Sequence, residues 1–406
     1  MKTSQLSRTS CVLLALFNLL LLAGCPPLVS GWIRTYGGTH SDYGKDLTQT
    51  FEGGYAVAGT TYSYGTTNGD LYLLKVTSNG NQSWYYTYGG FEFEKGYRIA
   101  QADDGGIVVA GTTTSFGAGE LDACLLKVDG AGAYQWFRTY GTADDETVLG
   151  LGKTKDGGYI LVGTSINIQS GNQDIYLVKT DADGVADWTR GIDYGGEEIG
   201  VGVVQAADGG YAITGQRILV DPLADSPPGY TATMCLVKTD ENGIASWIEE
   251  FGENAAGFDI CLSGDGGYVM AGAASGSALD PLDEDDGFAV RTDGDGNEVW
   301  SFLYDRPAQT CWLLSVMPCS GGGFIFSGDE GDAALMLKTD ENGVDEWSRR
   351  FGESRGTRAS GAAIIESSWG GYCLAGSQYD SDSDDWSVYM VKTDEDGNTG
   401  LPLTLP

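Results

Sequence analysis

Short apolar segments alternate with glycine-rich turns along most of the chain. In the first clear unit, the hydrophobic and polar positions predict four strands, near 43–50, 55–61, 70–76 and 83–88. The third strand begins Asp-Leu-Tyr-Leu-Leu and is apolar on both faces, which is typical of a strand between two packed layers. The unit therefore predicts a small four-stranded sheet, whose strands we name a to d in chain order.

The same unit occurs seven times. A Gly-Gly pair precedes strand b, a Lys or Arg ends strand c, and a further glycine turn, often Asn-Gly or Asp-Gly, leads into strand d. These turns require positive φ, which glycine adopts without steric strain. The most regular marker is a tryptophan near the start of strand d: Trp32, Trp84, Trp136, Trp188, Trp247, Trp300 and Trp347. We therefore expect an all-β, seven-bladed β-propeller built from four-stranded antiparallel blades.

The order of the strands predicts how the ring closes. The chain enters the repeat on an isolated strand d at 32–36 and leaves it after a strand c at 385–392. The N-terminal strand is therefore expected to complete the seventh blade. Residues 401–406 are a competing candidate, but their two prolines favour a C-terminal tail. The predicted propeller spans 32–400.

The N-terminal segment has the pattern of an export signal. Two basic residues precede an apolar run at 11–22, which is short for a membrane span. The run ends in Leu22-Ala23-Gly24-Cys25, which resembles a bacterial lipobox. The resemblance implies that residues 1–24 are a signal peptide and that Cys25 becomes a lipidated N-terminus carrying fatty acyl chains such as palmitate. An ordinary signal peptide and an uncleaved anchor are the alternatives.

A lipidated Cys25 leaves a short linker, 25–31, before the first repeat. The protein is then exported and anchored to a membrane through its N-terminal lipid. Pro26 is not the aspartate that retains such lipoproteins at the inner membrane in enterobacteria, which favours the outer membrane or cell surface.

The charge limits the classes of partner. The formal net charge is −34, from 57 acidic and 23 basic residues. Nucleic-acid binding needs clustered Lys and Arg, so nucleic acid is excluded as a partner. The surface suits cations, basic partners or a salty medium, and we expect a protein or glycan partner.

The two ends of the blades differ in their connections. The a–b and c–d turns are tight and alike in every repeat, and we name their side of the ring the uniform face. The b–c and d–a connections vary in length, and we name their side the variable face. Function usually lies in loops that differ, so the variable face is the predicted binding face. Its candidate residues are acidic: Asp280, Asp283, Glu284, Asp285, Asp286, Asp380, Asp382 and Asp384.

Calcium is the one metal that this pattern suggests. Asp380, Asp382 and Asp384 alternate and offer hard oxygen ligands. No glycine-fixed calcium loop follows them, so a solvated acidic loop is the preferred interpretation. The sequence indicates no other cofactor, and whether a metal binds stays open.

No catalytic set converges in the sequence. The single histidine, His40, lies near Ser41 and Asp42, but neighbours in sequence do not make a catalytic triad. One histidine also excludes metal centres with several histidine ligands. A non-enzymatic binding or scaffold module is the leading hypothesis. A carbohydrate-active or quinone-dependent propeller enzyme is the alternative.

Parts of the repeat resemble known families. The unit Lys-Thr-Asp-x-x-Gly-x-x-x-Trp, at 179–188, 238–247 and 338–347, resembles the tryptophan-docking repeat of quinoprotein-like propellers. That resemblance implies that each tryptophan packs against the neighbouring blade. It does not imply a quinone, because the vicinal cysteine pair is missing and those propellers have eight blades.

Two further resemblances concern the whole repeat. From 32 to 397 it is similar to the Asp-Gly-Gly-Tyr propeller repeats of uncharacterised bacterial and archaeal surface proteins, which implies the fold and no activity. A lipoprotein carrying a propeller is also similar to outer-membrane assembly lipoproteins of the BamB type, which again have eight blades.

The mature cysteines favour free thiols. Cys124 and Cys235 occupy apolar strand-c positions, where a buried thiol is expected. Cys311 and Cys319 flank one predicted strand and are too far apart to pair. The pairing of the remaining two stays open.

Overall fold

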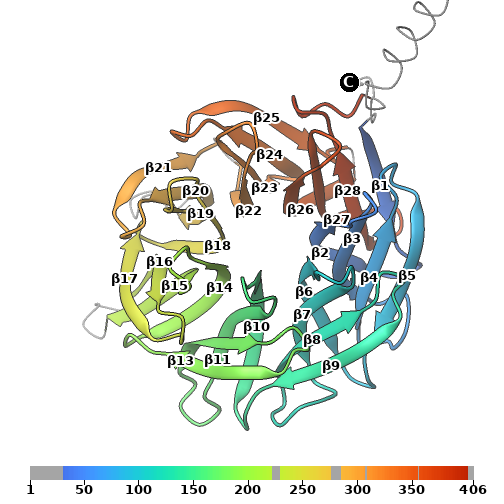
Figure 1. Cartoon of the computed structure of the whole chain (residues 1–406). Coiled ribbons are helices and arrows are strands. Elements are labelled where there is room, and N and C mark those ends of the chain that lie inside the picture. Colours follow the sequence, from blue (N-terminus) through green and yellow to red (C-terminus); the bar gives the residue numbers. More distant parts are fainter. Residues whose placement is uncertain (1–30, 222–228, 276–284, 307–308, 355, 401–406) are drawn as a thin grey trace, which may run out of the picture.

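In the computed structural model, seven four-stranded sheets surround a central axis (Figure 1). The structure describes residues 31–221, 229–275, 285–306, 309–354 and 356–400. Each sheet is an antiparallel meander, with strand a nearest the axis and strand d at the rim. The expected seven-bladed propeller is confirmed. The predicted signal peptide, Cys25 and the tail at 401–406 lie outside the described residues.

The strands follow chain order around the ring. Blades one to three contain β2 (Asp42–Gln49), β3 (Tyr55–Thr61), β4 (Asp70–Val76), β5 (Gln82–Tyr88); β6 (Glu94–Gln101), β7 (Ile107–Thr113), β8 (Asp122–Val128), β9 (Tyr134–Tyr140); β10 (Asp145–Lys153), β11 (Tyr159–Ile166), β12 (Gln173–Thr180) and β13 (Ala186–Ile192). Blades four and five contain β14 (Glu197–Gln205), β15 (Tyr211–Asp221), β16 (Gly229–Thr239), β17 (Ala245–Phe251); β18 (Ala255–Leu262), β19 (Tyr268–Ser275), β20 (Asp285–Thr292) and β21 (Glu298–Tyr304). Blades six and seven contain β22 (Cys311–Pro318), β23 (Phe324–Glu330), β24 (Ala333–Thr339), β25 (Asp345–Phe351); β26 (Thr357–Glu366), β27 (Tyr372–Asp380), β28 (Asp385–Lys392) and β1 (Trp32–Tyr36).

The first strand of the chain closes the ring. β1 pairs antiparallel with β28, with Trp32 opposite Lys392 and Tyr36 opposite Val388. The seventh blade therefore combines the two ends of the chain, as the strand order predicted. No helix within the described ranges is long and apolar enough to cross a membrane.

The tryptophans dock onto the next blade. Each ring packs against the c–d glycine of its neighbour, where a side chain would not fit; a Cβ on Gly243, for example, would lie 2.6 Å from the Trp188 ring. Trp32 also donates an indole hydrogen bond to the Ser78 carbonyl, at 2.9 Å. The docking pairs are Trp32–Gly80, Trp84–Gly132, Trp136–Gly184, Trp188–Gly243, Trp247–Gly296, Trp300–Gly343 and Trp347–Gly397. The packing that the quinoprotein-like resemblance implied is therefore present.

The basic residue at the end of strand c links both turns of the uniform face. Lys238 is buried, and its Nζ lies 2.7 Å from Asp208 in the a–b turn and 2.8 Å from the Thr239 carbonyl. The hydrogen bond from Lys238 lowers the pKa of Asp208. Lys179 and Asp156 repeat this pair at 2.8 Å in blade three. The regularity of the uniform face is thus explained by packing and ion pairs.

The b–c segment of repeat four is longer than in the first three repeats. Val220 and Asp221 still belong to β15. They pair with Tyr230 and Gly229 of β16, so the insertion lengthens a hairpin. The apolar run before them favours continued pairing over a loop.

The cysteines are buried and unbridged, as expected for the four residues predicted. All six described cysteines are free and buried. Burial raises the pKa of Cys235 and Cys373 to about 12. These thiols are therefore protonated and unreactive at neutral pH.

Candidate functional site

The structure describes only part of the predicted acidic binding face. Five candidates are described: Asp285 and Asp286 begin β20 of blade five, Asp380 ends β27 of blade seven, and Asp382 and Asp384 lie in the connection between β27 and β28. The other candidates lie outside the described residues: Asp280, Asp283 and Glu284.

The aspartates of blade seven make local hydrogen bonds. Asp380 accepts the Asp382 amide at 2.9 Å, and Asp384 accepts the Tyr379 hydroxyl at 2.7 Å. Asp384 has a φ of 59°, as in a tight turn. Within the described residues these aspartates do not form a converging group of three acidic ligands. Asp380 and Asp384 therefore both take part in forming the turn.

A second set of carboxylates lies deeper on the variable face, between blades. An aspartate at the first or second position of a strand c faces a glutamate from strand a of the next blade. All of these side chains are buried except that of Asp174, which is half-buried. The pairs are Asp70–Glu94 between blades one and two, Asp122–Glu146 between blades two and three, and Asp174–Glu198 between blades three and four.

Backbone amides and hydroxyls satisfy the first two pairs. Glu94 accepts the Gly90 amide at 3.0 Å and the Thr113 hydroxyl at 2.8 Å. Glu146 accepts both the amide of Thr142, at 2.9 Å, and its hydroxyl, at 2.8 Å. These carboxylates therefore stabilise the d–a connections, because each one caps amides of its own loop.

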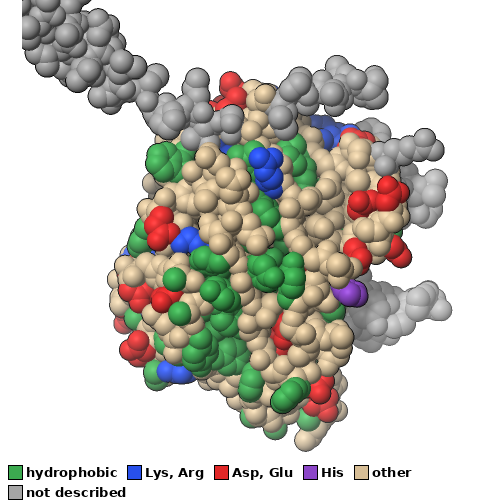
Figure 2. Space-filling model, turned by 90° about the vertical axis from the view of Figure 1, so that its right-hand side faces the viewer, with side chains coloured by type: hydrophobic (Ala, Val, Ile, Leu, Met, Phe, Trp, Pro, Cys, Tyr) green, Lys and Arg blue, Asp and Glu red, His purple; other side chains and the backbone are tan. Residues whose placement is uncertain are grey.

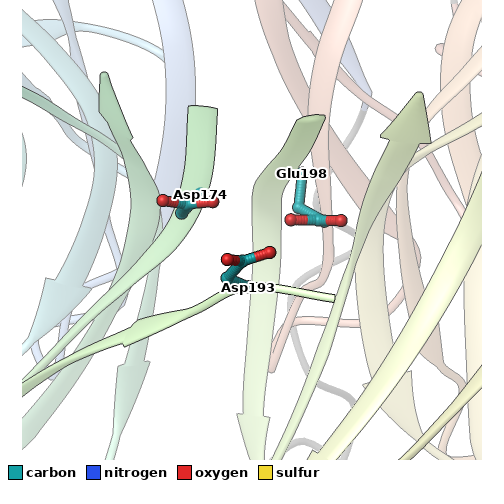
Figure 3. Close-up of side chains that lie close together, drawn as sticks. All are labelled: Asp174, Asp193 and Glu198. Atoms are coloured by element: carbon teal, nitrogen blue, oxygen red, sulfur yellow. The ribbon is translucent and has the colours of Figure 1, made fainter. Parts of the chain in front are cut away.

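The third pair has an additional acid. Asp193, directly after β13, joins Asp174 of β12 and Glu198 of β14 (Figure 3). One carboxylate oxygen from each residue lies within 4.8 Å of the others. Asp193 is exposed, whereas Glu198 is fully buried. This is the one group of three acidic side chains with converging ligand atoms in the described part of the chain.

Arg217 is the nearest cation to this group. Its Nε lies 3.6 Å from Glu198, while its Nη1 pairs with Glu250 and its Nη2 donates to the carbonyls of Tyr194 and Gly195, at 2.7 and 3.0 Å. Burial raises the pKa of Glu198, and Arg217 opposes the rise. The guanidinium is therefore shared among several acceptors and only partly neutralises the acidic group.

A cavity lies on the axis of the ring. It has a volume of about 430 Å³ and is lined by the innermost strands near their a–b ends, including Leu47, Ile99 and Val203. Asp46 and Asp259 also line it, together with Arg98.

The charged groups of the cavity connect neighbouring blades. Asp46 accepts the Ile99 amide of blade two at 2.9 Å, and Asp259 accepts the Val316 amide of blade six at 3.0 Å. Burial raises the pKa of Asp46 to about 6. These carboxylates therefore hold strands a together, and each already has amide partners.

The described residues offer no catalytic triad at the histidine. His40 is exposed and contacts Thr39 at 3.2 Å, while Ser63 donates to its carbonyl at 2.7 Å. Asp42 is buried and accepts the Ser63 hydroxyl at 2.7 Å. The neighbours of His40 therefore stabilise a loop, and the histidine does not line the axial cavity.

The rim of blades one and two exposes aromatic side chains (Figure 2). Tyr85 stacks on Tyr64 at 4.4 Å between ring centroids, and Tyr86 packs on Trp84 at 5.3 Å. In blade two the residue equivalent to Tyr86 is Arg138, whose guanidinium lies over the tryptophan. Blade one therefore presents flat rings where blade two presents a cation.

Comparison with known proteins shows the fold alone. No family model matches the chain, and no curated protein matches it. Among solved structures, the Neurospora crassa Pan2 WD40 domain is 10% identical with a TM-score of 0.54, over 87% of this chain and 89% of that one. YCF48 bound to D1 peptide is 9% identical with a TM-score of 0.51, over 90% and 98%. A Dyadobacter fermentans protein of unknown function is 11% identical with a TM-score of 0.50, over 79% and 96%.

Proposed function

We propose that the protein is an extracytoplasmic lipoprotein whose propeller binds a partner through its variable face, without catalysis. The observation that carries this proposal is the difference between the two faces. Docked tryptophans and Lys–Asp pairs occupy the uniform face, blade after blade, whereas the connections of the variable face differ from blade to blade. Loops that are free of a common structural role are where binding specificity usually resides.

Lipidation at Cys25 would fix the orientation of the ring. Trp32, at the start of β1, pairs with Lys392 and contacts Gly80, so it lies on the uniform face. Six residues separate Cys25 from Trp32, and such a segment spans at most about 20 Å. The uniform face would then lie against the membrane, and the variable face would be directed away from it.

The exposed side chains of the variable face favour a partner with apolar and basic groups. Phe91 is 90% exposed in the β5–β6 connection, and Phe116 is 47% exposed in the β7–β8 connection. The acidic net charge would attract a basic partner over long range. Peptide binding by a propeller of similar fold, YCF48, is consistent with a protein partner.

Photo-crosslinking in the native membrane tests the proposal. A photoreactive residue at position 91 or 116 of the full lipoprotein should capture one dominant partner in near-stoichiometric yield. The control is the same residue at Ile244, which is 54% exposed on the uniform face. Equal capture from all three positions, or no capture above background, would refute a partner on the variable face.

The aromatic rim supports a glycan as the second candidate partner. Exposed rings such as Tyr85 and Tyr86 suit stacking against sugar faces. Glycan-array binding that is lost in Tyr86→Ala and kept in a Phe91→Ala variant would move the site to the rim. The quinone-dependent and BamB-type alternatives gain no support from the fold, because those propellers have eight blades and this ring has seven.

A further inference from the structure

An aspartate replaces a glycine at two blade interfaces, as Asp193 and as Asp305, and of these only Asp193 belongs to a converging group of three acidic side chains in the described residues. The residue five positions after the strand-d tryptophan is Gly89 in the first repeat and Gly141 in the second, but Asp193 in the third. Gly141 lies directly against a carboxylate pair, and a Cβ there would fall 2.7 Å from Glu146 and closer still to Asp122. Position 193 therefore places a third carboxylate where the neighbouring interfaces have no side chain.

The third carboxylate increases an already unfavourable charge. Three carboxylate oxygens lie within 4.8 Å of one another at Asp174, Asp193 and Glu198. Burial raises the pKa of Asp174, and the neighbouring Asp193 raises it further. Arg217 supplies one positive charge, which it shares with Glu250. An additional cation would relieve this repulsion.

Glu198 is the least satisfied carboxylate of this interface. Its side chain is fully buried, and neither oxygen accepts a hydrogen bond of good geometry. The Tyr194 amide and Arg217 are near enough to lower its pKa, but they only partly offset its burial. The Nε of Arg217, 3.6 Å away, also lacks a hydrogen bond. At the equivalent residue Glu146, both carboxylate oxygens accept hydrogen bonds from Thr142, one from its amide and one from its hydroxyl. Burying a carboxylate whose oxygens lack hydrogen-bond partners destabilises the folded state. The position of Glu198 beside two further acids therefore points to a bound cation.

We propose that Asp174, Asp193 and Glu198 bind one calcium ion between blades three and four. Calcium takes six to eight hard oxygen ligands in flexible geometry, and main-chain carbonyls and water would complete the set. Zinc is disfavoured because no histidine or cysteine belongs to the group. Magnesium is disfavoured because it requires near-ideal octahedral geometry.

The ion would connect two blades. Asp174 belongs to β12 of blade three, Glu198 belongs to β14 of blade four, and Asp193 lies in the connection between the blades. Calcium binding should therefore stabilise the ring at this interface. The proposal does not depend on lipidation or on a partner at the variable face.

Calorimetric titration of the purified lipoprotein in detergent with CaCl₂ tests the site. We expect one ion per chain, with a dissociation constant on the order of 10⁻⁴–10⁻³ M, as in extracellular calcium modules. Asp193→Asn should weaken binding at least about tenfold, and Asp193→Gly should do the same while restoring the residue of the neighbouring repeats. The matched control is Asp183→Asn, which removes one charge from an exposed turn of the same blade on the uniform face.

Thermal unfolding provides a second measurement. Calcium at 5 mM should raise the melting temperature of the wild type and of Asp183→Asn by the same amount, and should raise that of Asp193→Asn by clearly less, because the variant binds calcium more weakly. Magnesium at the same ionic strength should have a smaller effect. Equal stabilisation by both metals in all variants would show general charge screening and overturn the proposal, as would titration without one saturable calcium site.

Discussion

The tryptophan–glycine docking contact can be tested by comparing two glycines with the same backbone angle. Gly243 and Gly171 both have a φ of +74°. A Cβ at Gly243 would lie 2.6 Å from the Trp188 ring, whereas a Cβ at Gly171 would meet nothing within 4 Å. Alanine at either position must adopt the left-handed conformation, but only alanine at 243 must also displace the ring.

The magnitudes follow from these two effects. The left-handed conformation costs an alanine about 1–2 kcal/mol, and this cost applies to both variants. Overpacking against a ring held by its own blade adds about 1–3 kcal/mol. We therefore expect Gly171→Ala to lower the free energy of unfolding by about 1 kcal/mol, and Gly243→Ala to lower it by about 3 kcal/mol.

Equilibrium urea unfolding of the purified protein, followed by far-ultraviolet circular dichroism, measures both losses. A double variant combining Gly243→Ala with Trp188→Leu should lose less than the sum of the single variants, because the smaller side chain removes the overlap. Equal losses in the two glycine variants would refute the docking argument, since backbone strain alone would then explain both.

Three further predictions concern acid stability, thiols and anchoring. Burial raises the pKa of Asp156, but hydrogen bonds from Lys179, Thr154 and the Gly158 amide together outweigh it and bring the pKa down to about 2. The stabilisation by Asp156 is therefore complete above the unfolded pKa of about 4 and disappears as pH falls towards 2. The free energy of unfolding in urea at pH 6 should therefore be about 1 kcal/mol higher for the wild type than for Asp156→Asn, a value reduced because Asp156 is exposed. This difference should vanish near pH 2, and a difference that does not change with pH would contradict the role given to Asp156. The six buried thiols should resist iodoacetamide at pH 8 until the protein is denatured, as mass spectrometry can show, and rapid native labelling of Cys235 would contradict their burial. Cys25→Ser should abolish incorporation of labelled palmitate and shift the protein from the detergent phase to the aqueous phase, with Cys124→Ser as the control; unchanged partitioning would refute lipidation.

The sequence was sufficient to predict the ring because each blade repeats the same local constraints. The predicted strands at 55–61 and 70–76 coincide with β3 and β4. Turn glycines such as Gly53 and Gly80 have positive φ, as the turn chemistry required. Ring closure was also predictable, because the order of strands leaves β1 one possible place.

The acidic group between blades three and four was not predicted. The sequence pattern favoured the acidic loop that contains Asp380 and Asp384. In the structure these two side chains accept hydrogen bonds within their own turn. The signal was present in the repeat alignment, since Asp193 replaces a glycine and Glu198 follows at a regularly acidic position. Proximity across a blade interface and the missing hydrogen bonds of Glu198 become visible only in three dimensions.

The strand that closes the ring is also the first strand of the chain to be synthesised, so its position constrains assembly. β1 must wait for β28, the last strand to be made, before it can pair at Trp32–Tyr36. Tension on an anchored N-terminus would act directly on these five residue pairs and on the Trp32–Gly80 contact. A protease that cuts before Trp32 would release an intact ring, whereas one that cuts after Tyr36 would leave the seventh blade with three strands. The pairing of β1 with β28 is therefore both the last step in assembling the ring and the contact that a pull on the N-terminus would load first.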